Sequence, residues 1–145
     1  MLRNEKYEVL IKKATYNLNQ FIKALETLRR AVETKENSEF VQDAAVQRFE
    51  YTYELSWKLI KSVLELKGTI LKHPNEIFSA AFSSDWIKNP EAWDSMIDDR
   101  NLTSHTYKAR TAEDVYKSIV NSYYSEFKFL ETTIKGVIEN AFNNT

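Results

Sequence analysis

An apolar stripe near the start of the chain constrains the fold more than any other feature of the sequence. Its members step along the chain by four and three residues in alternation: Tyr7, Ile11, Ala14, Leu18, Phe21, Leu25, Leu28 and Val32. This spacing follows the period of an α-helix and places eight apolar side chains on one face. The sequence therefore predicts one long helix with a single buried face.

A second long helix is expected from about Glu39 to Lys67. Asn37 or Ser38 can cap its N-terminus, and Gly68 is suited to end it, since glycine accepts the left-handed conformation past a helix C-terminus. Only the short polar link "TKENS" separates this helix from the first. The two helices are therefore expected to form an antiparallel hairpin.

The last third of the chain predicts another long helix. Thr111 and Asp114 form a capping-box pair at its start. Its apolar positions are Val115, Ile119, Tyr123, Phe127, Leu130, Ile134 and Val137. The tail "NAFNNT" is expected to fray. Between the second and third long helices, "HPNEIFSAAF" and "NPEAWDSMIDD" predict short helices, each with a proline near its start.

These elements predict an all-α fold. The chain has only two glycines and two prolines, whereas a many-stranded fold needs turn residues often. We expect an up-down antiparallel helical bundle of about five helices, three long and one or two short. No linker or repeat divides the chain, so residues 1–145 are expected to form a single helical bundle domain.

Composition excludes several functions. The chain has no cysteine, which rules out disulfides, thiolate zinc sites and thiol nucleophiles. Its net charge is −1, so any contact with nucleic-acid phosphates has to come from a local patch. No apolar run approaches the roughly 20 residues that cross a bilayer, and "MLRNEKYEVL" has no signal-peptide core. A cytoplasmic protein without membrane contact is expected.

The stretch "DDRNLTSHTY", residues 98–107, gathers side chains that suit phosphodiester chemistry. Arg100 can hold a phosphate and stabilise charge growing on it, and Asn101 adds a polar group beside it. His105 can move protons near neutral pH. Together they suit RNA cleavage by transesterification, in which the RNA's own 2′-hydroxyl attacks, and this chemistry needs no metal.

Helix geometry sets a condition on this hypothesis. Five residues of α-helix turn through about 500°, which leaves Arg100 and His105 roughly 140° apart. They can act together only if the helix ends or distorts between them, or if a second subunit completes the site. The pattern alone leaves open a capped helix end with solvated polar side chains.

Other polar residues admit further interpretations. Asp94, Asp98 and Asp99 could bind a divalent metal, form a solvated face, or orient Arg100 through an ion pair. His73 is interpreted as an exposed loop histidine without a partner. The aromatic residues of "FEYTYELSW" favour a role in the core and in an interface, with Tyr51 and Tyr53 at a subunit contact; base stacking is the alternative.

A family resemblance rests on three features together: the long first hairpin, the segment "QRFEYTYELSWK" and the intact Arg-x4-His-x-Tyr motif of "RNLTSHTY". In these the chain resembles the HEPN superfamily, specifically the nucleotidyltransferase substrate-binding proteins. The resemblance covers nearly the whole chain. It implies a helical bundle that forms a homodimer and a complex with a minimal nucleotidyltransferase encoded nearby.

The resemblance also implies roles for the motif residues. Arg100 would bind and polarise a phosphate, His105 would be the general acid/base, and Asn101 would assist. Tyr107 would accept AMP from the partner, and the added charge and bulk would silence a metal-independent ribonuclease toxin. No cofactor and no bound metal are implied.

Two hypotheses for the function follow. In the first, the protein is a toxin ribonuclease that its partner neutralises. In the second, it is a non-catalytic subunit that presents a nucleotide or other substrate to the partner nucleotidyltransferase, and Arg100 and His105 are anion-binding or interface residues. The intact motif favours the first hypothesis but is compatible with both.

Overall fold

The structure is a computed structural model that describes residues 2–100 and 110–144. The described part of the chain is helical apart from short connections, which confirms the predicted all-α fold. None of its helices is long and apolar enough to cross a membrane. The elements in chain order are α1 (Leu2–Glu33), α2 (Glu39–Leu66), α3 (Pro74–Ser83), α4 (Pro90–Arg100), α5 (Ala112–Ser118), the π-helical turn η2 (Ile119–Tyr123) and α6 (Tyr124–Asn143).

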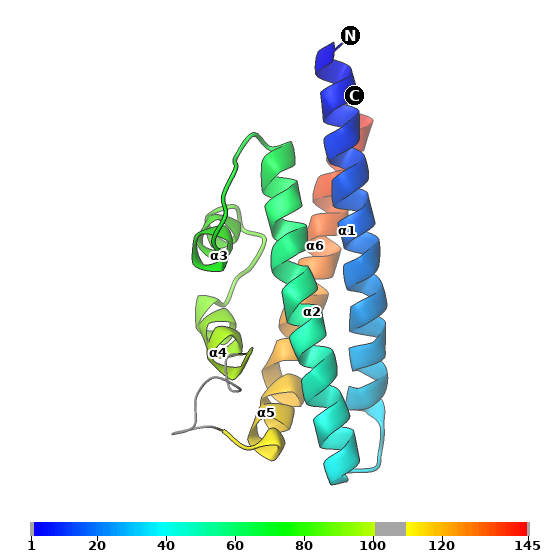
Figure 1. The fold of residues 1–145 in the computed structure, drawn as a ribbon, viewed down its shortest axis with the longest axis vertical. Coiled ribbons are helices and arrows are strands. Elements are labelled where there is room, and N and C mark those ends of the chain that lie inside the picture. The colour runs from blue at the N-terminus through cyan, green and yellow to red at the C-terminus, as the bar shows by residue number, and fades with distance from the viewer. Residues whose placement is uncertain (1, 101–109, 145) are drawn as a thin grey trace.

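Three long helical rods and two short helices make up the bundle, as the sequence predicts. Helix α1 descends in Figure 1, α2 rises beside it, and α5, η2 and α6 form one continuous rod that rises behind them. The long rods α2 and α6 therefore run parallel, and both are antiparallel to α1. The short helices α3 and α4 provide the return path, on the side of α2 away from α1 (Figure 1).

The apolar stripes predicted from the sequence line the core. In α1 the six central stripe positions are buried, and the outer members Tyr7 and Val32 are half-buried. At the centre, Phe49 of α2 stacks on Tyr123 with ring centroids 5.1 Å apart, and Phe21 meets Phe127 edge-on at 5.9 Å. These aromatic contacts join the three long rods around one cluster.

The π-helical turn explains an unusual spacing in the last rod. Val115, Ile119, Tyr123 and Phe127 follow one another by four residues, and all are buried. On a regular α-helix three such steps would rotate the side chain by about 120° and carry it off the core face. A turn closed by i→i+5 hydrogen bonds holds more residues, so it keeps these four side chains facing the core.

The helix ends follow local capping chemistry. Ser38, one of the two candidate caps, accepts a hydrogen bond from the backbone N–H of Val41, and Gly68 takes a φ of +92° beyond α2. Thr111 and Asp114 form the predicted capping box. Of the tail "NAFNNT", expected to fray, residues up to Asn143 belong to α6, and Ala141 is buried in a small cluster with residues of α1 and α2.

Candidate functional site

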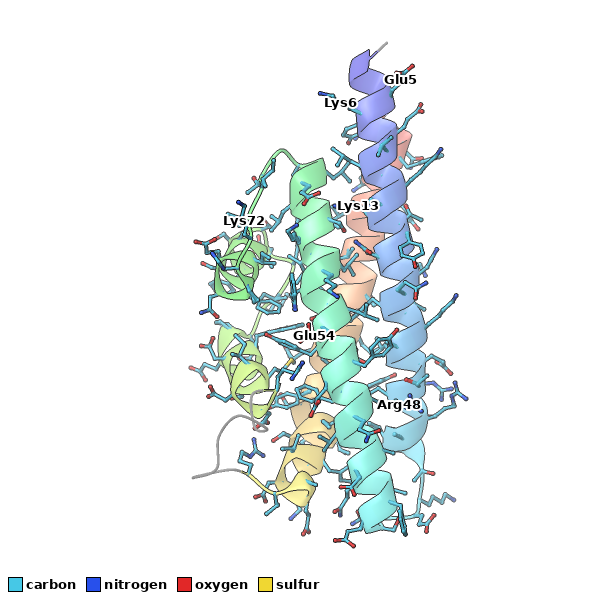
Figure 2. The ribbon with its side chains drawn as sticks, viewed as in Figure 1. Glu5, Lys6, Lys13, Arg48, Glu54 and Lys72 are labelled. Atoms are coloured by element: carbon cyan, nitrogen blue, oxygen red, sulfur yellow. The ribbon has the colours of Figure 1, made fainter. Side chains whose placement is uncertain are left out.

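Arg100, the last residue of α4, is held by a glutamate that lies 46 residues earlier in the chain. Its Nε donates a hydrogen bond of 3.0 Å to Glu54 Oε1, and both side chains are about one third exposed. Glu54 lies midway along α2 (Figure 2). The ion pair uses Nε, so Glu54 does not engage the two terminal amino groups of the guanidinium.

Glu54 also fixes an aromatic ring. Its second oxygen, Oε2, accepts a hydrogen bond of 3.1 Å from Trp57 Nε1, one turn further along α2. One carboxylate therefore orients both a guanidinium and an indole.

An open groove lies over the Arg100–Glu54 ion pair, and we call it the arginine groove. Its lining is Tyr53, Glu54, Trp57, His73, Pro74, Asn75, Ile97 and Arg100.

Tyr53 forms part of the floor of this groove and is only 4% exposed. Burial, and to a smaller extent the neighbouring Glu54 carboxylate, raise the pKa of its hydroxyl to about 12 against the opposing effect of Arg100. The neutral form of Tyr53 is therefore strongly favoured below pH 10. Its hydroxyl offers a hydrogen-bond group at the floor of the groove.

Asp99, the neighbour of Arg100, points the other way, into the bundle. It is 2% exposed, and its Oδ2 accepts hydrogen bonds from Tyr123 Oη at 2.5 Å and from Arg110 Nη1 at 2.9 Å. Burial raises the pKa of Tyr123, and the hydrogen bond to Asp99 raises it further. The Tyr123 hydroxyl therefore stays neutral and donates a hydrogen bond to the Asp99 carboxylate.

Arg110 closes the network on the far side of the motif stretch. Its Nη2 donates to the backbone oxygen of Asp114 and to Ser118 Oγ, each at 2.7 Å. Arg110 thereby joins the start of α5 to Asp99 at the end of α4. The two ends of the stretch 101–109 are tied together by a charged hydrogen bond to a buried carboxylate.

Only one of the four predicted site residues lies among the described residues. Arg100 lies at the described end of α4 and lines the arginine groove, with its side chain about one third exposed. Asn101, His105 and Tyr107 lie outside the described residues, and so does the part of the chain that decides whether the helix breaks between Arg100 and His105. Their roles remain predictions.

The acidic residues of α4 do not act as a group. The interpretation that they orient Arg100 is wrong, because Glu54 pairs with Arg100 and Asp99 pairs with Arg110. Asp94 and Asp98 are exposed, whereas Asp99 is buried. Within residues 2–100 and 110–144, no cluster of three or more histidine or acidic side chains is placed to hold a metal ion.

The structure corrects the expectation for Tyr53 and adds a location for His73. Tyr51 is 51% exposed and stays available for a subunit contact, but Tyr53 belongs to the core and the groove floor rather than to an interface. His73 is exposed, as expected, yet it lines the arginine groove together with Arg100.

The sequence interpretation missed Glu54 as a partner of Arg100. The signal available was its place inside "QRFEYTYELSWK", where Glu54 and Trp57 stand three residues apart on one helix face. Nothing in the local pattern links this face to Arg100, because their contact depends on how α4 packs on α2. Arg110 was missed for the same reason.

The protein is an all-α helical bundle in which an arginine at the end of the fourth helix is held over a groove. Residues 16–136 match the model of the family described as nucleotidyltransferase substrate binding protein like. The chain belongs to this family, which confirms the resemblance found in the sequence.

One curated relative and two solved structures are similar to the chain. The probable ribonuclease HepT of Haemophilus influenzae is 33% identical over 91 residues, which cover 59% of this chain and 62% of the relative. The chain thus spans less than two thirds of that relative's length. A crystal structure from Thermus thermophilus is 30% identical with a TM-score of 0.62, covering 81% of this chain and 98% of the other.

A second structure shares the fold at lower identity. It is the tri-AMPylated HEPN toxin of Shewanella oneidensis in complex with the MNT antitoxin. This toxin is 13% identical to the chain, with a TM-score of 0.67, and the similarity covers 85% of this chain and 96% of the toxin. At this identity the similarity shows the fold alone.

Proposed function

We propose that this protein is the toxin of a two-protein module, a metal-independent endoribonuclease that a partner nucleotidyltransferase neutralises. The observation that carries the proposal is an Arg-x4-His-x-Tyr motif whose arginine is fixed on an open groove by Glu54, in a chain of this family. The names of the Haemophilus influenzae relative, a probable ribonuclease, and of the Shewanella oneidensis toxin support it.

Arg100 is the phosphate-binding group in this proposal. Glu54 bonds to Nε and leaves the edge formed by Nη1 and Nη2 out of the ion pair. A guanidinium can donate from this edge to two phosphate oxygens at once. Because Glu54 limits the motion of the side chain, less conformational freedom is lost when the phosphate binds.

His105 moves the protons. The RNA 2′-hydroxyl loses its proton to the imidazole and attacks the adjacent phosphorus, the P–O5′ bond breaks, and O5′ leaves after receiving a proton. The products carry a 2′,3′-cyclic phosphate and a 5′-hydroxyl, so the step consumes no water. Asn101 assists by donating a hydrogen bond to the phosphate.

Tyr107 is the control point. The partner would transfer AMP from a nucleoside triphosphate to the Tyr107 hydroxyl, with release of pyrophosphate. The new phosphodiester places a negative charge and a nucleoside two residues from His105. It repels the RNA phosphate and fills the space near Arg100, and the ribonuclease is switched off.

A homodimer is the proposed active form. On α2 the exposed residues Phe40, Ala44, Gln47 and Tyr51 follow one another at helical spacing, and Phe40 is 87% exposed. Continued by one turn, this face reaches Glu54, the partner of Arg100. A second copy seated on this face would bring its own motif stretch toward Arg100, which meets the geometric condition that the motif spacing sets.

Co-expression with a neighbouring nucleotidyltransferase followed by intact-mass measurement tests the module. A mass increase in units of AMP, abolished in Tyr107→Phe, is expected. The isolated protein should cleave RNA in the presence of a metal chelator, and His105→Ala should not. Intact RNA after incubation with a well-folded wild-type dimer would overturn the ribonuclease proposal.

A non-catalytic role is the second candidate, favoured by the family's description as substrate binding. The subunit would then present a nucleotide or other substrate to the partner. Its presence would change the partner's nucleotide affinity, and the partner would change this subunit's affinity by the same factor. Calorimetric titration of the partner with nucleotide, with and without the subunit, separates the two roles.

A further inference from the structure

A second groove, rich in lysine, lies beside the arginine groove. Four lysines line it, together with Asn17, Ser62 and the indole of Trp57: Lys13, Lys58, Lys61 and Lys72. Lys13 on α1 and Lys72 before α3 lie at the same level on either side of α2 (Figure 2). The groove therefore runs across α2, and we call it the lysine groove.

The two grooves are neighbours. Trp57 lines both of them, and Lys72 of the lysine groove is followed directly in the chain by His73 of the arginine groove. A chain molecule lying in the lysine groove and continuing past Trp57 would reach Arg100.

The lysine groove is positive on a protein whose net charge is −1. Glu65 neutralises part of this charge, with hydrogen bonds from Lys13 at 3.0 Å and from Lys61 at 3.2 Å. Lys58 and Lys72 are exposed, and neither has an ion pair within residues 2–100 and 110–144. Two unneutralised ammonium groups therefore face the groove.

Trp57 supplies an aromatic surface at the junction. Its ring is half-buried, and Nε1 is fixed by Glu54. The ammonium of Lys58 lies 5.9 Å from the ring centroid. A positive groove that tracks the backbone, with an aromatic ring on which a base stacks, is how proteins bind single-stranded nucleic acid without reading its sequence.

We propose that the lysine groove binds the sugar-phosphate backbone of single-stranded RNA, with a base stacked on Trp57, and directs the next phosphate to Arg100. This inference rests on the proposed ribonuclease function and names the surface that holds its substrate. Lys58 and Lys72 each contact one phosphate. The site selects a single strand, because a base inside a duplex cannot stack on the indole.

The salt dependence of RNA binding tests the proposal. Binding is measured for a mixed-sequence single-stranded RNA on the His105→Ala protein, so that no cleavage interferes. The Lys58→Gln/Lys72→Gln double variant should reduce the slope of log affinity against log salt by about 1.4, roughly 0.7 for each phosphate contact. Lys23→Gln/Lys135→Gln is the matched control, since both lysines are exposed and lie outside either groove.

Tryptophan fluorescence gives an independent test. Trp86 and Trp93 are 6% and 1% exposed, so Trp57 is the tryptophan that a base can reach. The same RNA should quench the emission of the His105→Ala protein, and the additional change Trp57→Phe should remove the quenching while a phenyl ring retains much of the affinity.

The outcomes separate this inference from the function on which it rests. An unchanged salt slope in the double variant, or quenching that survives Trp57→Phe, would show that the lysine groove does not bind RNA, even if the wild-type protein cleaves RNA. A reduced slope combined with a wild-type protein that leaves RNA intact would instead support the groove and overturn the ribonuclease. If the Lys58→Gln/Lys72→Gln variant loses binding to the partner nucleotidyltransferase while its RNA binding is unchanged, the groove is a partner site and the proposal is overturned.

Discussion

Arg110 and Asp99, which flank the motif stretch in the sequence, are joined by a hydrogen bond. Arg110 Nη1 donates a hydrogen bond of 2.9 Å to Asp99 Oδ2, although the two residues lie 11 positions apart on either side of residues 101–109. Asp99 is buried, and Tyr123 holds it from the π-helical turn. The stretch that carries the predicted acid/base and modification residues therefore starts and ends on a fixed part of the core.

Arg110→Gln should reduce RNA cleavage even under conditions in which the variant is fully folded. Asp99 is buried and would lose its charged partner, so we expect the change to lower the free energy of unfolding by about 1–3 kcal/mol. The ends of the motif stretch would no longer be tied, and small misplacements of reacting groups can cost about 100-fold in rate. Single-turnover cleavage and urea unfolding, measured on the same preparation, check this.

Arg110→Lys should not rescue the loss, because a single ammonium cannot reproduce contacts that the guanidinium makes through two amino groups to Asp99, Asp114 and Ser118. If folded Arg110→Gln cleaves RNA at the wild-type rate, the role assigned to the tie is wrong and Arg110 is a purely structural residue.

Glu54→Gln should weaken the orientation of Arg100. The amide can still accept one hydrogen bond, but the charge that attracts the guanidinium is lost. We expect about a tenfold lower kcat/KM for RNA and a change of no more than about 1 kcal/mol in unfolding free energy, since the pair is about one third exposed. Glu39→Gln, an exposed change in the first turn of α2, is the control and should leave cleavage unchanged.

The buried tyrosines predict how the protein responds to alkali. Burial raises the pKa of Tyr53 to about 12, above its ordinary value near 10 in the unfolded chain. The resulting contribution to stability is fully present below about pH 10 and is lost as the pH rises toward 12. Ultraviolet titration should show Tyr53 ionising only well above pH 10.

The variant Tyr53→Phe should remove a late-ionising group from this titration. If Tyr53→Phe leaves the late part of the titration unchanged, the environment assigned to Tyr53 at the groove floor is wrong.

The exposed face of α2 predicts where the dimer forms. Phe40→Glu and Tyr51→Glu place charges on side chains that are 87% and 51% exposed, so each variant should fold as the wild type does. If a second copy covers this face, the double variant should be monomeric at micromolar concentration and should lose cleavage. Sedimentation velocity measures the first effect, with Val9→Glu, at a 64% exposed position of α1, as a control.

A dimer that survives in the double variant would place the interface elsewhere. A wild-type protein that is monomeric and still cleaves RNA would contradict the need for a second subunit.

Local patterns predicted the helices well because periodicity and capping act within a few residues. The stripe of α1 and the capping box of Thr111 and Asp114 are of this kind. The four-residue spacing at Ile119, Tyr123 and Phe127 was also visible, and a π-helical turn is the backbone that accommodates it.

The site was less accessible to sequence analysis, because its contacts join distant segments. Glu54 meets Arg100 across 46 positions, and this pairing depends on the angle at which α4 packs on α2. The same holds for His73, which only the fold brings to the groove of Arg100. Conversely, the roles of His105 and Tyr107 rest on the motif and the family resemblance.

The central claim is that His105 is the acid/base of RNA cleavage, and RNA cleavage by two histidine variants tests it most directly. The chain has only two histidines, and the other one, His73, lines the arginine groove and is the alternative acid/base. In the presence of a chelator the wild-type protein should release products with a 2′,3′-cyclic phosphate. His105→Ala should lose at least about 100-fold in rate, whereas His73→Ala should retain activity within about tenfold. Cleavage that survives His105→Ala, or that is abolished only by His73→Ala, would contradict the account.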